Sequence, residues 1–208
     1  MRHFLEIGAK GLSAVFYPLW IPTYGMILFC GTVHQVIPLP FRYWLVSVGC
    51  TLLLTGLLPI SLIFYQVRQG YIKDIYIINK EERTAAYIET AIGFAFWWYL
   101  LAFILKAPQW LSGIAISATL AIVLVAIINI YWKISAHLTG MGGLLGGIIT
   151  YSFAYNTCSV PLVITVLLLS LAVMYARLYL NAHTNWQVIA GLALGMTCTI
   201  LIPLLFYA

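Results

Sequence analysis

Charged side chains are what this sequence has least of. Only 7% of its 208 residues are Asp, Glu, Lys or Arg, and just five of them are acidic. Soluble domains carry about 25% charged residues, whereas 63% of this chain is hydrophobic. A soluble fold cannot bury that much apolar surface. The composition therefore excludes soluble enzymes and binding domains and predicts an integral membrane protein.

Grouped metal ligands, cofactor motifs and linkers are also missing. The four cysteines lie in or beside apolar stretches without zinc-site spacing, so we expect no metal, no cofactor and no disulfide. The net charge of +5 is modest, and anionic lipid of the bilayer is a simpler partner for it than nucleic acid, which we do not expect. The absence of a linker, a repeat or a low-complexity tract predicts one membrane domain over residues 1–208.

Apolar runs of spanning length make up most of the chain. A helix needs roughly 20 residues to cross a bilayer, and it satisfies its own backbone hydrogen bonds there. We therefore expect an all-α, polytopic transmembrane bundle of six to seven spans, with the short, glycine-rich 139–156 as the questionable one. The mixed segment 1–12 is expected to lie along the membrane surface. The runs cover 14–33, 44–66, 86–105, 110–132, 139–156, 159–177 and 188–206.

Three polar stretches interrupt these runs, at 67–85, 133–137 and 177–187. The first holds four of the ten Lys and Arg residues and three of the five acids. Consecutive stretches are separated by two spans each, and two crossings return a chain to the side it left. The three stretches are therefore expected at one face of the membrane.

Glycines spaced four apart accompany the second and third stretches. Such spacing lets helix backbones approach closely. It is typical of membrane packing in general, and it also suits two helices drawn together beside His137 and His183. The pairs are Gly142 and Gly146, Gly143 and Gly147, and Gly191 and Gly195.

The residues in the three stretches suit phosphoryl transfer. Guanidinium and ammonium groups neutralise phosphate oxygens. One histidine can attack phosphorus while a second protonates the leaving oxygen. For Arg177 or His183 taken singly, a structural role at a span end is the simpler interpretation.

The motifs resemble those of the type 2 phosphatidic acid phosphatase superfamily, over about residues 73–196. That family carries Ser-Arg-x5-His-x3-Asp, which here reads Ala176-Arg177-x5-His183-x3-Gln187. Its Pro-Ser-Gly-His reads Ile134-Ser135-Ala136-His137. Its first motif, Lys-x6-Arg-Pro, is best matched by Arg83-Thr84, with Tyr76 at the lysine position and Lys80 or Lys73 as the substitute.

The resemblance implies a metal-independent hydrolase that acts on lipid phosphomonoesters or diphosphates through a phosphohistidine. His183 would be the nucleophile and His137 the general acid. Lys80, Arg83, Ser135, Arg177 and the backbone amide near Ala136 would hold the phosphate.

The departures from the family pattern concern mainly Gln187, which replaces an aspartate. Its carbonyl can still accept the imidazole N–H, but it supplies no negative charge to an imidazolium. Asn185 and Glu89 are candidates to compensate, and Glu89 could equally pair with a nearby basic residue. Gln187 and the incomplete first motif also suit an alternative, a non-catalytic member that binds phospholipid headgroups or a membrane protein. A small transporter is disfavoured by the lack of inverted repeats.

The side that the site faces stays open. The site face carries eight Lys and Arg residues, and the other face carries two, Arg42 and Lys106. Because cytoplasmic loops are enriched in Lys and Arg, this difference favours a site that faces the cytoplasm. Four of the eight are candidates for chemistry, however, and without them the difference is small. Many members of the resembled family act on the outer face of the bacterial inner membrane, which is the membrane we expect.

Overall fold

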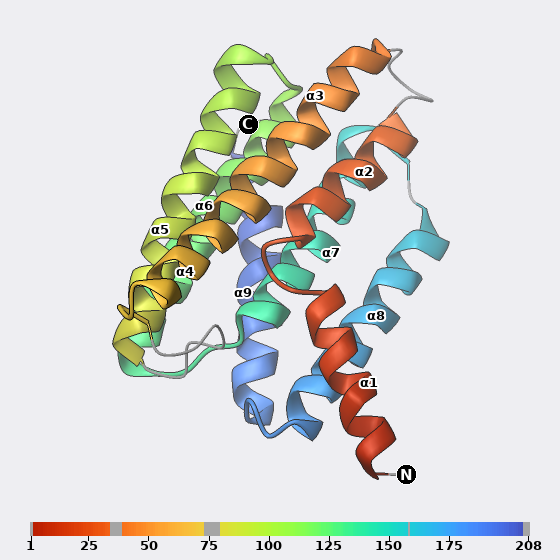
Figure 1. Ribbon diagram of the computed structural model, residues 1–208. Coiled ribbons are helices and arrows are strands. Elements are labelled where there is room, and N and C mark those ends of the chain that lie inside the picture. The colour runs from red at the N-terminus through yellow and green to blue at the C-terminus, as the bar shows by residue number, and fades with distance from the viewer. Residues whose placement is uncertain (1, 34–38, 73–79, 158, 206–208) are drawn as a thin grey trace.

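The chain is described here by a computed structural model, which covers residues 2–33, 39–72, 80–157 and 159–205; Arg2, Val33, Lys80 and Glu81 are described without their side chains. Every regular element in these ranges is helical (Figure 1), which confirms the all-α prediction. The α-helices are α1 (Arg2–Val15), α2 (Ile21–Val33), α3 (Phe41–Thr51), α4 (Leu58–Arg68), α5 (Lys80–Tyr99), α6 (Gln109–Tyr131), α7 (Ala136–Ala154), α8 (Val160–Tyr179) and α9 (Asn185–Leu204). Two π-helical segments, η1 (Leu52–Leu57) and η2 (Leu100–Ile104), continue α3 into α4 and extend α5.

Five helical segments in the described ranges are long and apolar enough to cross a membrane, fewer than the six to seven spans expected from sequence. They are Phe41–Arg68, Glu82–Ile104, Gln109–Tyr131, Val160–Tyr179 and Asn185–Leu204. Large apolar side chains such as Phe64, Phe96 and Leu168 point outward from them, as expected where the solvent is lipid. The five helices make the chain compatible with an integral membrane protein.

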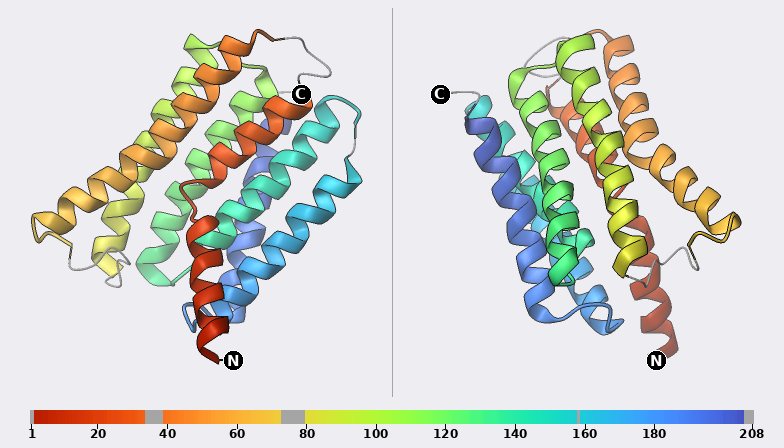
Figure 2. Two further views of the ribbon diagram at one scale, coloured as in Figure 1. Left: turned by 45° about the vertical axis from the view of Figure 1, so that its right-hand side comes forward. Right: turned by 90° about the vertical axis from the view of Figure 1, so that its left-hand side faces the viewer.

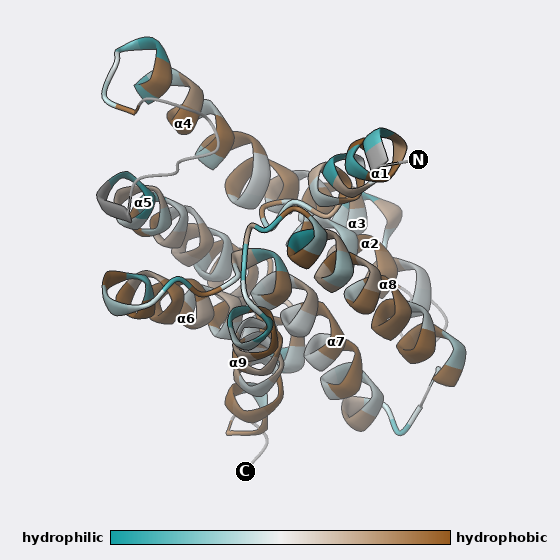
Figure 3. Ribbon diagram, turned by 90° about the horizontal axis from the view of Figure 1, so that it is seen from below, coloured by the Kyte–Doolittle hydropathy of each residue, from teal (hydrophilic) through white to brown (hydrophobic). Residues whose placement is uncertain are grey.

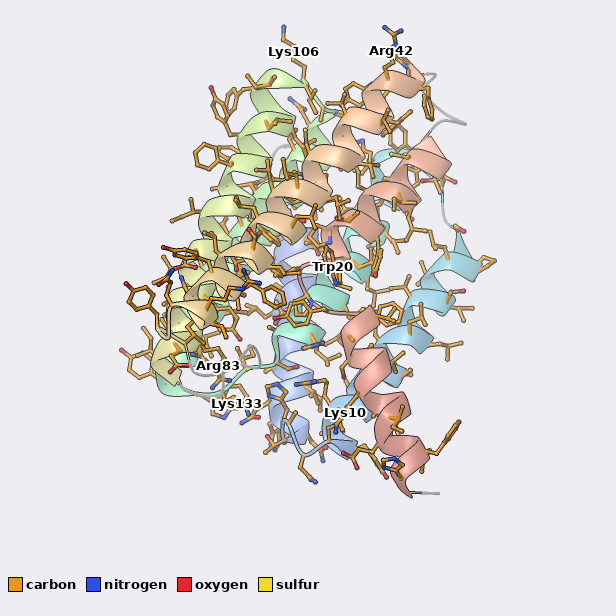
Figure 4. All side chains as sticks on the ribbon, in the orientation of Figure 1. Lys10, Trp20, Arg42, Arg83, Lys106 and Lys133 are labelled. Carbon is orange, nitrogen blue, oxygen red and sulfur yellow. The ribbon has the colours of Figure 1, made fainter. Side chains whose placement is uncertain are left out.

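The expected span at 14–33 is divided in two, which is a correction to the sequence prediction. Pro18 lacks an N–H and disfavours helical backbone at the residue before it, so α1 ends at Val15 and α2 begins only at Ile21. Neither piece alone is long enough to cross. Figure 4 places Trp20, in the break, about halfway along the bundle.

The first residues, which were expected to lie along the membrane surface, belong to helix α1. Helix α1 runs lengthwise beside α8 rather than across the ends of the other helices (Figures 1 and 2). It buries Ala9 and Ser13. Its C-terminal end thereby reaches the interior of the bundle.

The other expected run that is not among the five is α7, which is 19 residues long and holds five glycines. It lies at the centre of the bundle, where its closest neighbour is α9. A Cβ on Gly195 would collide with the carbonyl of Thr139, and one on Gly142 with that of Leu192. These glycines therefore bring the backbones of α7 and α9 into direct contact, as the spacing predicts.

Basic residues lie at both ends of the bundle, and more of them at one end. Arg83, Lys133 and Lys10 lie toward one end, whereas Arg42 and Lys106 lie at the other (Figure 4). Seen from the first of these ends, the helix tips are hydrophilic and the helix sides apolar (Figure 3). We call this the basic end.

Candidate functional site

The three polar stretches meet at the basic end, around the start of α7. Helix α5 supplies Arg83, the connection between α6 and α7 supplies Lys133 and Ser135, and the end of α8 with the turn after it supplies Arg177 and His183. Backbone bonding joins two of these segments, because Ser135 N–H donates to the Gln187 carbonyl at 3.2 Å. Close packing of α7 on α9 thus sets the distance between the two histidine-bearing segments.

His183 is held by the first turn of α9. Its Nδ1 lies 3.2 Å from Gln187 Oε1, and the backbone N–H of Thr184 donates to the same oxygen at 3.1 Å. Two donors converging on this atom identify it as the amide oxygen, so Nδ1 carries the proton. The lone pair of the neutral imidazole is then on Nε2, the atom available for nucleophilic attack.

His137 is held by the end of α1. Its Nε2 donates to the Ser13 carbonyl at 3.1 Å, and the Tyr17 ring packs edge-on against it with centroids 5.6 Å apart. The Ser13 carbonyl can accept this bond because the helix ends there. Its usual helical donor, the Tyr17 N–H, bonds instead to the Ala14 carbonyl. A carbonyl at a helix C-terminus carries partial negative charge, which strengthens the hydrogen bond that it accepts from the imidazole.

Three buried hydrogen-bond donors that have no partner in the described ranges lie in the segments that make up this end of the bundle. The Nε of Arg83, the Nε of Arg177 and the hydroxyl of Ser135 are each buried and have no partner among the described residues. Leaving such groups unsatisfied is costly. The three donors come from three segments of one basic end, and an anion with several oxygens is a partner that suits such donors.

The positively charged groups at the site lower the pKa of their neighbours. Burial lowers the pKa of His183 to about 4; Arg177, Lys133 and Arg83 act in the same direction, and the hydrogen bond to Gln187 opposes them. Partial burial, with Arg83 and Arg177, also lowers the pKa of Lys133. His137 lies within electrostatic range of Arg177 and His183. The site is thus a cluster of cations around two histidines.

Other residues singled out from sequence occupy different positions. Lys80 is the first residue of α5, but its side chain is outside the described part of the chain, as is all of Lys73. Ala136 is the first residue of α7, whose opening amides have no partners within the helix. Asn185 is exposed. Glu89 accepts from the amide of Gln66 at 2.5 Å rather than pairing with a basic residue in the described ranges.

Sequence reasoning missed two tyrosines that lie at the site. Tyr17 and Tyr87 both interact electrostatically with Arg177. Tyr87 could have been found, because it lies one helical turn beyond Arg83 on the same face of α5. Tyr17 could not, because its position depends on the break at Pro18, which hydropathy conceals.

The described residues contain no group of three His, Cys, Asp or Glu side chains placed to hold a metal ion. The chain matches no family model, no curated protein and no solved structure in the comparisons made.

Proposed function

We propose that the protein is a membrane lipid phosphatase that hydrolyses a lipid phosphomonoester or diphosphate through a phosphohistidine. The observation that carries the proposal is that Arg83, Arg177 and Ser135, at the same end of the bundle as the two histidines, each hold a buried donor without a partner in the described residues. Phosphate has the charge and the oxygens to satisfy these donors. Simple anion binding needs the basic groups but not two histidines oriented separately, His183 by Gln187 and His137 by Ser13.

In the first step, Nε2 of His183 attacks phosphorus and forms a P–N bond while the P–O bond to the leaving group breaks. The leaving oxygen takes a proton from His137. Arg83, Arg177 and the Ser135 hydroxyl stabilise the charge on the non-bridging oxygens. The first amides of α7, at Ala136, add backbone donors and the positive end of the helix dipole. Lys80, one turn before Arg83, is proposed as a further cation.

In the second step, water attacks phosphorus and the P–N bond breaks. His137, now neutral, accepts the proton of the water, and inorganic phosphate leaves. The sum is hydrolysis, with water as the only co-reactant. Both histidines return to their starting protonation state, so the cycle is complete.

The position of the site suits a substrate anchored in a bilayer. The basic end lies at one end of the apolar helices, the depth at which lipid headgroups are found. In this proposal α7 and the α1–α2 pair cross the membrane with the five long helices, giving seven passes. The phosphatase core is about residues 73–196. A bacterial inner membrane is the proposed location.

Phosphate release from the purified protein, over a panel of lipid phosphates, tests the proposal. The expected result is turnover by the wild type and its loss in His183→Ala. Arg42→Ala, at the opposite end of the bundle, is the matched control and should keep full activity. If the wild type binds lipid phosphates but hydrolyses none, the protein is a headgroup-binding protein and the enzymatic proposal is wrong.

A further inference from the structure

A narrow apolar cavity, with about 100 Å³ open to the centre of a water molecule, lies between the helices near the site. Helix α7 lines it with Ala136, Gly140, Gly143 and Gly147, a spacing that places these residues on one face of the helix. From the first of them to the last the helix rises about 16 Å. Helices α2, α5 and α6 form the other walls. The cavity is therefore long and thin and runs along the helices.

The walls offer nothing for a polar ligand to bind. The hydroxyls of Thr139 and Thr199, both lining residues, donate to Ser135 and Gly195 carbonyls of their own helices, at 3.0 and 2.9 Å. The indole of Trp97 donates outward to Thr51 at 2.8 Å. A cavity whose polar atoms are all satisfied in this way stays dry and takes apolar ligands.

One end of this cavity lies next to residues of the proposed phosphate site. Ala136, which lines it, lies between Ser135 and His137, and Pro18, also a lining residue, follows Tyr17. We propose that the cavity holds the hydrocarbon chain attached to the phosphate, as a single extended chain. The space that the centre of a water molecule can occupy is about 100 Å³, and drawn out over about 16 Å it leaves width for one chain and not for two. The substrate class is then a single-chain lipid phosphate, an inference that rests on the proposed function.

Glycines keep the cavity open. A Cβ on Gly143 would meet only the Thr199 methyl, at 3.7 Å, and one on Gly147 would meet Ile114 and Phe29 at 3.5 Å. These are ordinary contacts, in contrast to Gly142, where a Cβ would strike the backbone of α9. A leucine at Gly143 is therefore expected to fill the cavity while the backbone stays in place. Gly49 has open space around it and provides the same substitution on an outward helix face.

The test is the chain-length profile of monoalkyl phosphates, from ethyl to dodecyl, with the wild type, Gly143→Leu and Gly49→Leu. For the wild type, kcat/KM should rise about fourfold per methylene while the chain fills the cavity, and then level off. Gly143→Leu should level off several carbons earlier and lose roughly 100-fold on dodecyl phosphate, with ethyl phosphate unchanged. Gly49→Leu should follow the wild type. Identical profiles for all three proteins would overturn the inference.

A binding measurement separates this inference from the proposed function. Dodecyl phosphate brominated along its chain should quench the fluorescence of Trp97, which lines the cavity. The quenching assigned to this residue, by comparison with Trp97→Phe, should fall in Gly143→Leu and persist in Gly49→Leu. Equal quenching in both variants would overturn the cavity assignment. Absence of turnover on every ester, ethyl phosphate included, would instead count against the phosphatase.

Discussion

The side-chain oxygen of Gln187 lies 3.2 Å from Nδ1 of His183 and 3.1 Å from the backbone nitrogen of Thr184. One amide group thus orients the proposed nucleophile and also closes the first turn of α9. A substitution at this position can act in two ways: it can remove the hydrogen bond to the imidazole, or it can change the charge beside the imidazole. Substitutions at Gln187 separate the two.

Gln187→Ala should lower kcat by about 100-fold, because His183 loses its orienting partner. It should also cost about 1 kcal/mol of unfolding free energy, because the Thr184 amide loses its acceptor. Gln187→Glu has the same reach and keeps both hydrogen bonds while adding a negative charge, so it should retain the stability. Steady-state kinetics with thermal unfolding checks both variants. Equal kcat in the wild type and Gln187→Ala would remove Gln187 from the mechanism.

The titration of His183 gives a second prediction. With a pKa of about 4, the imidazole is neutral and nucleophilic at pH 7, and it should gain its proton only as the pH falls toward 4 rather than near 6.5. Histidine carbon NMR, with His183→Ala for assignment, measures the midpoint. Saturating inorganic phosphate should raise that midpoint, because an anion offsets the repulsion from Arg177, Lys133 and Arg83. A midpoint near 6.5 that phosphate leaves unmoved would contradict the cationic site.

The two arginines should be individually necessary. Arg83→Ala and Arg177→Ala should each lower kcat/KM by roughly 100- to 1,000-fold, since each removes a buried donor to the phosphoryl oxygens. Arg83→Lys keeps the charge but not the planar fork, and should recover only part of the loss. Arg42→Ala is the control. If Arg83→Ala and Arg42→Ala behave alike, α5 does not contribute to the site.

His137 should matter in proportion to the basicity of the leaving group. An alkoxide needs a proton to depart and p-nitrophenolate does not, so His137→Asn should lose about 100- to 10,000-fold on alkyl phosphates and far less on p-nitrophenyl phosphate. Pro18→Ala should show the same selectivity in weaker form. Without the proline the helix can continue, the Ser13 carbonyl then accepts from Tyr17 N–H, and His137 loses its hydrogen-bond partner. A uniform loss on both substrates would make His137 structural rather than a proton donor.

Hydropathy and motif spacing predicted the helical class and the polar stretches that the structure brings to one end. Two crossings between stretches bring the chain back to one side whatever the details of packing. The glycine spacing likewise predicted the contact of α7 with α9, because only glycine admits a carbonyl at that distance. These features depend on local sequence and on the requirements of a bilayer, so the sequence predicts them without knowledge of the tertiary packing.

The features that the sequence did not predict depend on where helices end and on which side chains pack against each other in the folded chain. The run at 14–33 is apolar throughout, and hydropathy cannot distinguish one span from two half-helices that meet at Pro18. That break places Tyr17 and the Ser13 carbonyl against His137. Glu89 was assigned to basic partners by charge alone, whereas packing of α4 against α5 gives it Gln66.

In the proposed mechanism His183 becomes phosphorylated during each turnover. The direct measurement is rapid quenching of the purified protein with a lipid phosphate that carries labelled phosphorus, followed by location of the label on the chain. We predict an acid-labile, alkali-stable phosphoenzyme with the label on His183, absent from His183→Ala and accumulating in His137→Asn when the leaving group is p-nitrophenolate. Turnover that continues in His183→Ala, or label found on another residue, would contradict the account.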